Sequence, residues 1–250
     1  VSYANCGLPY YVGGVIEDEG DLTLQTPEGF FRRFRIDARV NHEVTGIDRV
    51  NKTISVTNLK TGESFTEDYD KLLLSPGAKP TLPDFYIESD RVFTLRTVED
   101  ALRIKAFAER MTGGRAIVVG GGFIGLEMAE NLVHLGISVT VIQRGSHLFS
   151  NVDADMASFI HAKLRGQGIE LILNTEVDSL KEAESGIAVE LKDGCTLSAD
   201  TVIVAVGVTP ESTLAKQAGL ALGTRGAIRV DGKMQTSVAD IYAVGDAVEI

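Results

Sequence analysis

The sequence is poor in residue types that mark several specialised classes of protein. It has no tryptophan, and its two cysteines, Cys6 and Cys195, lie far apart. Two distant thiols do not build a disulfide framework, so a reducing, cytoplasmic setting is expected. The cysteines and the four histidines show no zinc-type spacing, and no metal site is therefore predicted.

Basic residues are also in the minority. The net charge is −11, with 24 lysines and arginines against 35 aspartates and glutamates. This balance argues against nucleic acid as a partner, although backbone N–H groups and a few arginines can still hold an anionic cofactor. No apolar run approaches the ~20 residues of a membrane helix. No basic-then-apolar leader opens the sequence either, so no membrane segment is predicted.

Glycine, in contrast, is plentiful, and apolar segments of two periodicities alternate along the chain. The pattern predicts helices over 97–111, 123–136 and 153–168, with strands over 115–120, 138–144, 169–174 and 200–207. Thr97 is expected to cap the first of these helices, together with Asp100. Strands alternating with helices indicate an α/β fold with a parallel sheet.

Other segments predict antiparallel strands. Residues 40–80 are typical of a β meander, and the "KLLLS" run (71–75) is expected to be a buried strand that ends at Pro76 and Gly77. A turn is predicted at 192–194 and a hairpin around Asp231 and Gly232. A final apolar strand is expected to end at Gly245 and Asp246.

The most informative motif is the glycine loop "GGGFIG", residues 120–125. It follows an apolar strand and opens an amphipathic helix, as in a dinucleotide-binding βαβ unit. Gly120 permits the tight turn, Gly122 lets a pyrophosphate approach the backbone, and Gly125 lets the helix lie close to the strand. The helix N-terminus then offers unpaired N–H groups to the pyrophosphate.

The choice between NADH and NADPH depends on the end of the second strand. The acidic residue that usually accepts the ribose hydroxyls is missing, and Gln143 and Arg144 stand there instead. Gln143 can still bind a ribose hydroxyl, and Arg144 can meet a 2′-phosphate or be a solvated charge. The sequence slightly favours NADPH, or the use of both.

Read together, these motifs resemble those of the FAD-dependent pyridine nucleotide–disulfide oxidoreductases. The matching stretches are "SYANCGLPYYVGG", "SPGAKP", "GGGFIGLEMAE", "VIVAVGVTPES" and "DIYAVGDAVEI", in family order. The first is similar to the single-cysteine branch, which holds coenzyme A–disulfide and coenzyme A–persulfide reductases, NADH oxidases and NADH peroxidases. The resemblance implies a Rossmann-like NAD(P)-binding domain (83–208) inserted in a FAD-binding domain (1–82 and 209–250). It implies cofactor-binding roles for Val44, Pro76, Gly77, Phe123, Ile124, Glu127, Gly207, Gly245 and Asp246.

The same resemblance implies that the chain is a fragment. The family's first FAD-binding strand with its glycine loop, and its C-terminal dimerisation domain, have no match in these residues. The FAD-binding domain is therefore expected to be incomplete, and the intact protein is expected to be a homodimer. The resemblance does not decide whether the isolated piece holds FAD or is active.

Cys6 is expected to be the redox residue. In two-cysteine relatives a second cysteine follows five positions on, where this sequence has Tyr11. A lone thiol can form a mixed disulfide or persulfide with a small thiol, or become a sulfenic acid as in an oxidase or peroxidase. The resemblance places Ser2 and Asn5 near a coenzyme A substrate.

Arg33 and Arg35 form a basic cluster that could bind coenzyme A phosphates or simply be solvated. Phe34 lies between them, without the lysine that the family has in this neighbourhood. A non-catalytic nucleotide-binding or redox-sensing module is the remaining alternative.

Overall fold

A computed structural model describes residues 2–111 and 113–250, which form two compact units. One contains Ser2–Leu24 and Pro80–Gly207, and we call it the glycine-loop unit. The other contains Gln25–Lys79 and Val208–Ile250, and we call it the meander unit. Each unit has its own buried core, and each is described separately below.

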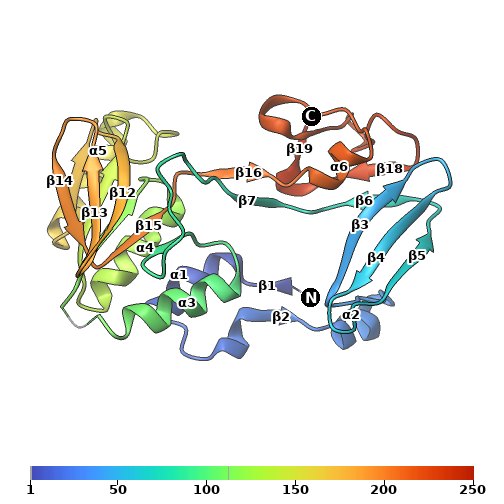
Figure 1. Ribbon diagram of the computed structural model, residues 1–250, viewed down its shortest axis with the longest axis horizontal. Coiled ribbons are helices and arrows are strands. Elements are labelled where there is room, and N and C mark those ends of the chain that lie inside the picture. Colours follow the sequence, from blue (N-terminus) through green and yellow to red (C-terminus); the bar gives the residue numbers. More distant parts are fainter. Residues whose placement is uncertain (1, 112) are drawn as a thin grey trace. The chain divides into compact units, whose positions relative to one another are not determined.

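The glycine-loop unit is built on a parallel sheet (Figure 1). Hydrogen bonds join its strands in the order β11, β10, β9, β15 and β8. The predicted α/β class is confirmed by this sheet. The strand bounds are β8 (Val92–Phe93), β9 (Arg115–Val119), β10 (Ser138–Gln143), β11 (Glu170–Leu173) and β15 (Thr201–Val204).

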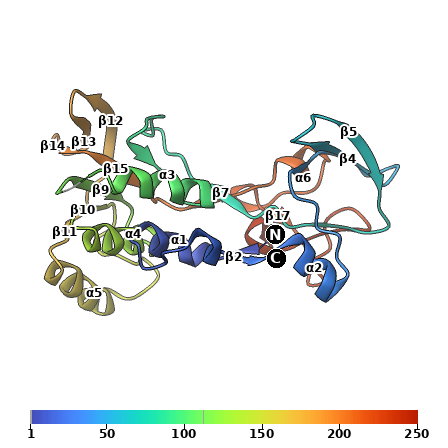
Figure 2. The ribbon, with the colours of Figure 1, turned by 90° about the horizontal axis from the view of Figure 1, so that it is seen from below.

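Successive strand residues point to opposite sides of this sheet. Each side is packed against a different core, so both faces are covered. Val118, Val141 and Ile203 belong to one core, which they share with helices α3 (Val98–Ala108), α4 (Phe123–His134) and α5 (Ala154–Gly166). Ile117, Ile142 and Val202 belong to the other core, under an antiparallel sheet. Figure 2 shows α4 and α5 on one side of the parallel sheet and this antiparallel sheet on the other. Its strands are β12 (Val177–Ala183), β13 (Gly186–Leu191) and β14 (Thr196–Ala199).

The three predicted helices are confirmed within a few residues. α3 begins with the expected capping box: the Asp100 N–H donates to Thr97 Oγ1 over 3.2 Å, and the Thr97 N–H donates to Asp100 Oδ2 over 2.9 Å. The turn at 192–194 is also found, between β13 and β14.

The cysteine segment packs into the glycine-loop unit. It runs through β1 (Ser2–Tyr3), the 3-10 turn η1 (Asn5–Gly7), α1 (Leu8–Val12), the 3-10 turn η2 (Glu19–Leu22) and β2 (Thr23–Gln25). Leu8, Val12 and Leu22 are buried in the same core as α3 and α4. The compact units thus divide the chain differently from the predicted domains, which placed residues 1–82 together. Burial of these apolar side chains is the physical reason.

The meander unit holds the expected antiparallel strands β3 (His42–Asp48), β4 (Thr53–Asn58) and β5 (Ser64–Asp68), preceded by α2 (Pro27–Phe34). β6 (Leu72–Leu74) pairs in parallel with β18 (Ile241–Ala243). The expectation of a buried strand here is only partly met, since Leu74 is buried but Leu73 is 59% exposed. The remaining elements are β7 (Ala78–Pro80), β16 (Val208–Pro210), α6 (Thr213–Gln217), the 3-10 turns η3 (Thr224–Gly226) and η4 (Gly245–Ala247), β17 (Ile228–Arg229) and β19 (Val248–Glu249).

The predicted hairpin around Asp231 and Gly232 is wrong. A turn does form there, with the Met234 N–H donating to the Asp231 carbonyl. However, β17 pairs in parallel with β19, and β18 pairs with β6. The turn therefore links two strands that have other partners, which turn residues alone cannot reveal.

Candidate functional site

The glycine loop between β9 and α4 is shaped by contacts that only glycine allows. Gly120 has φ +111°, and a Cβ there would lie 2.2 Å from the Ala205 carbonyl oxygen. A Cβ on Gly125 would lie 2.0 Å from the Gly120 carbonyl oxygen. Both separations are far inside van der Waals contact, so the loop closes tightly against β15 and the helix lies directly over the loop.

Gly122 differs from its two neighbours in the motif because the space around it is open. It is the N-cap of α4, and no side chain caps the helix. A Cβ built on Gly122 would meet nothing within 4 Å. The first turn of α4 also carries no acidic residue. The start of α4 therefore has no side-chain cap, no acidic residue and open space beside Gly122, which suits an anionic pyrophosphate.

Gln143, at the end of β10, supports the loop itself. The Gly121 N–H donates to Gln143 Oε1 over 3.0 Å. Arg144 follows, with a side chain that is 82% exposed and only a 3.9 Å contact from its Nε to Glu176 Oε1. Glu176 also pairs with Lys192. Arg144 is thus weakly held, and its guanidinium is accessible to a phosphate group.

A cavity of about 400 Å³ borders the N-terminal half of α4. α1 contributes Tyr10 to its lining, while Phe123 and Glu127 come from α4. The Phe123 ring is 63% exposed and lies edge-on to the Phe149 ring, with centroids 4.6 Å apart. Burial, with a smaller contribution from Glu130, raises the pKa of Glu127. Ile124 is instead packed against the core that the parallel sheet shares with α3, α4 and α5.

Cys6 lies in η1, directly before α1, in the same unit as the glycine loop. Its side chain is free and exposed, and Ser2 and Asn5 belong to the same short segment. Cys195 is also free and exposed, but the hydrogen bond and charge of Asp193 raise the pKa of its thiol. A raised pKa disfavours the nucleophilic thiolate, which argues against Cys195 as a redox residue.

The predicted FAD-side residues lie in the meander unit at the C-terminal ends of two paired strands. Because β6 and β18 are parallel neighbours, Pro76 and Gly77 follow one strand at the edge where Gly245 and Asp246 follow the other. The Val244 N–H donates to the Leu74 carbonyl oxygen over 3.0 Å, and a Cβ on Gly245 would lie 3.8 Å from Ser75 Oγ. These residues therefore lie together at one exposed edge of the paired strands.

Two further predicted residues, Val44 and Gly207, belong to different units. Val44 lies on β3, opposite Val56 of β4. Gly207 belongs to the glycine-loop unit, follows β15, and has φ +117° with open space where a Cβ would be.

Arg33 and Arg35 are on and after α2, which has no buried residue. The Arg33 guanidinium carbon lies 5.0 Å from the centre of the Phe34 ring, and that of Arg35 lies 5.5 Å from the Phe31 ring. Phe34 thus supports an arginine rather than separating the two cations.

Sequence reasoning missed Asn131, Tyr10 and His161. Asn131 is 4% exposed, on an otherwise apolar face of α4, and an isolated asparagine at a core position was the available signal. His161 Nε2 accepts the Leu148 N–H over 3.1 Å and so holds the loop after β10. Burial lowers the pKa of His161, which favours this neutral acceptor.

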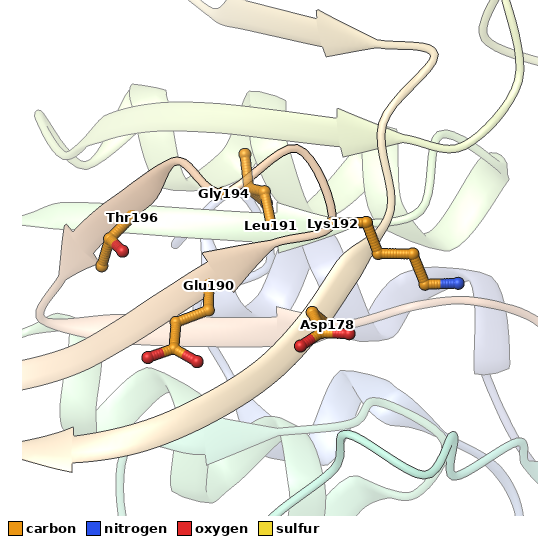
Figure 3. Close-up of a pocket in the computed structure, with 6 residues that line it drawn as sticks. All are labelled: Asp178, Glu190, Leu191, Lys192, Gly194 and Thr196. Carbon is orange, nitrogen blue, oxygen red and sulfur yellow. The ribbon is translucent and has the colours of Figure 1, made fainter.

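A further hollow of about 470 Å³ lies over the turn between β13 and β14 (Figure 3). Asp178, Glu190 and Lys192 line it, and two of these form ion pairs with neighbours: Glu190 with Lys181, and Lys192 with Glu176. Within the described residues, no cluster of acidic, histidine or cysteine side chains could hold a metal ion, and no helix is long and apolar enough to cross a membrane.

Comparison with known proteins is consistent with this geometry. The family model described as pyridine nucleotide-disulphide oxidoreductase matches residues 1–250. A coenzyme A disulfide reductase of Staphylococcus aureus (strain JH9) is 39% identical over 246 residues, which are 98% of this chain and 55% of that protein. The chain therefore spans about half the length of the curated relatives that it matches.

Two solved structures share the fold closely. The reduced Bacillus anthracis CoADR-RHD has a TM-score of 0.93 at 45% identity, over 99% of this chain and 44% of that chain. The NAD-dependent persulfide reductase from A. fulgidus has a TM-score of 0.92 at 36% identity, over 99% of this chain and 47% of that chain.

Proposed function

This chain belongs to the pyridine nucleotide-disulphide oxidoreductase family, and we propose that its parent protein reduces a coenzyme A disulfide or persulfide with NAD(P)H, through FAD and the Cys6 thiolate. One observation carries the proposal. A single compact unit contains both an uncapped, open glycine loop and an exposed cysteine that has no disulfide partner. The first is suited to a dinucleotide and the second to exchange with a small thiol.

The residues of the glycine-loop unit fit a dinucleotide. The N–H groups of the first turn of α4 bind the pyrophosphate, and the open space at Gly122 admits it. Gln143 holds the Gly121 N–H, and Arg144 is available for a 2′-phosphate, so NADPH is favoured and NADH is accepted. Glu127 lies half-buried beside the cavity at the same end of α4.

The residues of the meander unit fit the phosphate and ribityl portions of FAD, with the glycine backbone suited to a phosphate and the Asp246 carboxylate to a ribityl hydroxyl. The paired strands β6 and β18 present the backbone of Gly77 and Gly245, with Asp246, at one exposed edge. On this assignment residues 83–208 are the NAD(P)-binding domain, and 1–82 with 209–250 belong to the FAD-binding domain. When bound, NAD(P)H supplies a hydride and FAD relays its electron pair as a cofactor of the same protein.

The chain's own chemistry is sulfur exchange at Cys6. Its thiolate attacks one sulfur of the substrate disulfide, the S–S bond breaks, and the other sulfur leaves as a thiolate that takes a proton from solvent. The mixed disulfide on Cys6 then takes two electrons and a proton, which releases the second thiol and restores the thiolate. With a persulfide, the outer sulfur leaves as hydrosulfide. Exposure of Cys6 permits the attack, and the absence of a nearby second cysteine keeps the bond intermolecular.

The coenzyme A moiety is suggested by the names of the relatives in S. aureus and B. anthracis. Ser2 and Asn5 accompany Cys6 on the same segment and would contact the substrate. Arg33 and Arg35, each over a phenylalanine ring, would bind its phosphates. Assembly of the intact protein as a homodimer and a cytoplasmic location remain predictions.

A second candidate function uses the same exposed sulfur. Oxygen or peroxide chemistry would oxidise Cys6 to a sulfenic acid, as in an NADH oxidase or peroxidase. The accessibility of Cys6 favours this alternative as much as it favours a mixed disulfide.

The test compares Cys6→Ser with Cys195→Ser in the full-length protein. Both wild-type residues are free and exposed, so Cys195→Ser is a matched control. NADPH consumption is measured with coenzyme A disulfide, coenzyme A persulfide, oxygen and peroxide, each with analysis of the thiol products. We expect Cys6→Ser alone to abolish turnover of the disulfide and persulfide.

Turnover of oxygen or peroxide without a thiol would support the second candidate. Full activity of Cys6→Ser on every acceptor would refute the role of the cysteine. A full-length protein without flavin absorbance or NAD(P)H turnover would instead indicate a non-catalytic nucleotide-binding or redox-sensing module.

A further inference from the structure

The cysteine-bearing segment packs tightly against α4, the helix that follows the glycine loop, where Gly13 meets Asn131. Gly13 is the C-cap of α1 and is buried. Its φ of −73° is open to any residue, so backbone conformation does not require glycine there. The requirement is steric: a Cβ on Gly13 would lie 2.0 Å from Asn131 Oδ1 and 2.7 Å from both Asn131 Cβ and Cγ.

The Asn131 side chain is itself fixed. It is 4% exposed, and its Nδ2 donates to the Glu127 carbonyl oxygen over 2.8 Å. A new rotamer would move Oδ1 but not Cβ, which also lies inside contact distance. The C-terminal end of α1 can therefore approach α4 this closely only with glycine at 13.

A second contact holds α1 from the side of α3. The Tyr11 ring is 7% exposed, and the Lys105 Nζ lies 4.0 Å from its centre. Burial is the main cause that raises the pKa of the Tyr11 hydroxyl. α1 has only five residues and would be marginal alone. Its position is consequently set by α3 and α4 rather than by its own hydrogen bonds.

We propose that Asn131 is a positioning residue that fixes α1, and with it the Cys6 turn and Tyr10, on the nucleotide-binding helix. Cys6 and the η1 turn directly precede α1, so a displacement of α1 displaces the sulfur. Tyr10 is also on α1, and it lines the same cavity as Phe123 and Glu127. Asn131 therefore fixes the position of the Cys6 thiol relative to α4, where the dinucleotide is proposed to bind. The consequence for sulfur reduction rests on the proposed function, whereas the placement of α1 does not.

The first test uses the 250-residue chain with Cys195→Ser, which leaves Cys6 as its one thiol. Asn131→Ala, Gly13→Ala and the double variant Gly13→Ala/Asn131→Gly are compared with His134→Ala, an exposed position on the same helix. The readouts are amide hydrogen exchange over residues 8–13, the rate of Cys6 alkylation by iodoacetamide, and the NADPH dissociation constant.

In Asn131→Ala and Gly13→Ala we expect faster amide exchange in α1 and an altered rate of Cys6 alkylation. The NADPH dissociation constant of both variants should equal that of His134→Ala. The double variant should recover slower exchange than Gly13→Ala, because it removes the atoms that clash. Should Gly13→Ala not fold, Asn131→Ala decides the question, since it only deletes atoms. Exchange and alkylation equal to those of His134→Ala would overturn the proposal.

A second measurement uses the full-length protein. A 1 Å misplacement of a reacting group can cost about 100-fold in rate, so Asn131→Ala should slow reduction of the Cys6 mixed disulfide by up to about this factor. The reduction of flavin by NADPH should be unchanged. If the proposed function fails, this second readout is lost, whereas the exchange and alkylation results still support or refute the positioning role.

Discussion

Helices α3 and α4 lie in the same unit and begin in opposite ways. α3 is capped by its own side chains, with Thr97 and Asp100 exchanging hydrogen bonds with each other's backbone, and its first turn carries Glu99 and Asp100. α4 begins at Gly122, has no side-chain cap, and has no acidic residue in its first turn.

The difference separates a helix start that the protein satisfies itself from one that, on the proposed function, binds a dinucleotide. In α3 the unpaired N–H groups and the positive end of the dipole are satisfied within the protein. In α4 no side chain of the helix start caps the N–H groups, which on the proposed function bind a dinucleotide. The space beside Gly122 is open. The predictions that follow test this contrast, beginning with the largest effect.

Gly125→Ala should damage both the fold and the binding of NADPH. The added methyl group would lie 2.0 Å from the Gly120 carbonyl oxygen, and backbone cannot move aside as a side chain does. Such overpacking costs roughly 1–3 kcal/mol. Urea unfolding and an NADPH fluorescence titration of the 250-residue chain measure the two losses. Wild-type stability and affinity together would show that α4 does not need to lie so close to the loop.

Gly122→Ala should lose binding while keeping the fold. Its methyl group would meet nothing within 4 Å of protein but would occupy the open space beside the N-cap, where the proposed pyrophosphate binds. Loss of one charge-assisted hydrogen bond costs about 1.5–3 kcal/mol, or roughly 10- to 100-fold in affinity. The same titration measures the loss, and an unchanged midpoint in urea is the control. Unchanged affinity would mean that the pyrophosphate does not bind at this helix end.

Arg144→Ala should lower the affinity for NADPH but leave that for NADH unchanged. The exposed guanidinium has only a weak contact with Glu176, so little stability is lost. Its charge-assisted hydrogen bonds to a 2′-phosphate are worth about 1.5–3 kcal/mol, or roughly tenfold or more in affinity. Parallel titrations with the two nucleotides measure the difference, and Arg165→Ala, on α5, is the control. Equal changes for both nucleotides would argue that Arg144 does not read the 2′ position.

Thr97→Ala should reduce stability and leave binding untouched, the reverse of Gly122→Ala. Removal of the Thr97 hydroxyl breaks the bond from the Asp100 N–H, and loss of such a cap costs about 1 kcal/mol. Urea unfolding measures the cost, and the NADPH dissociation constant should stay at its wild-type value. A stability equal to wild type would show that solvent replaces the cap at no cost.

Glu127→Gln should give the smallest effect, a gain in stability at neutral pH. Burial raises the pKa of Glu127, so the folded protein holds this proton more tightly than the unfolded chain does. The stabilising contribution is present below the ordinary value of 4.5 and is lost as pH rises through the raised pKa. The advantage of glutamine should therefore shrink on acidification. Unfolding across pH, with exposed Glu182→Gln as the control, tests this, and a constant difference would contradict it.

Much of the glycine-loop unit was predictable because its signals are local. The spacing of Gly120, Gly122 and Gly125, the Thr97–Asp100 pair and the apolar periodicity each act within a few residues, and the structure contains the corresponding elements. The meander unit was less predictable. Its turn at Asp231 forms as expected, but β17 and β18 each pair with a strand other than the one across the turn. Strand pairing depends on distant segments, and turn chemistry does not specify it.

By itself, the sequence determined the α/β class, the glycine loop and the single-cysteine motif, since each depends on residue types at short, fixed spacings. Only the tertiary structure decided that Ser2–Leu24 packs with α3 and α4. It also showed that Gly13 is needed for space and not for backbone conformation. The physical reason is that close packing joins residues far apart in the sequence, as it joins Gly13 of α1 with Asn131 of α4.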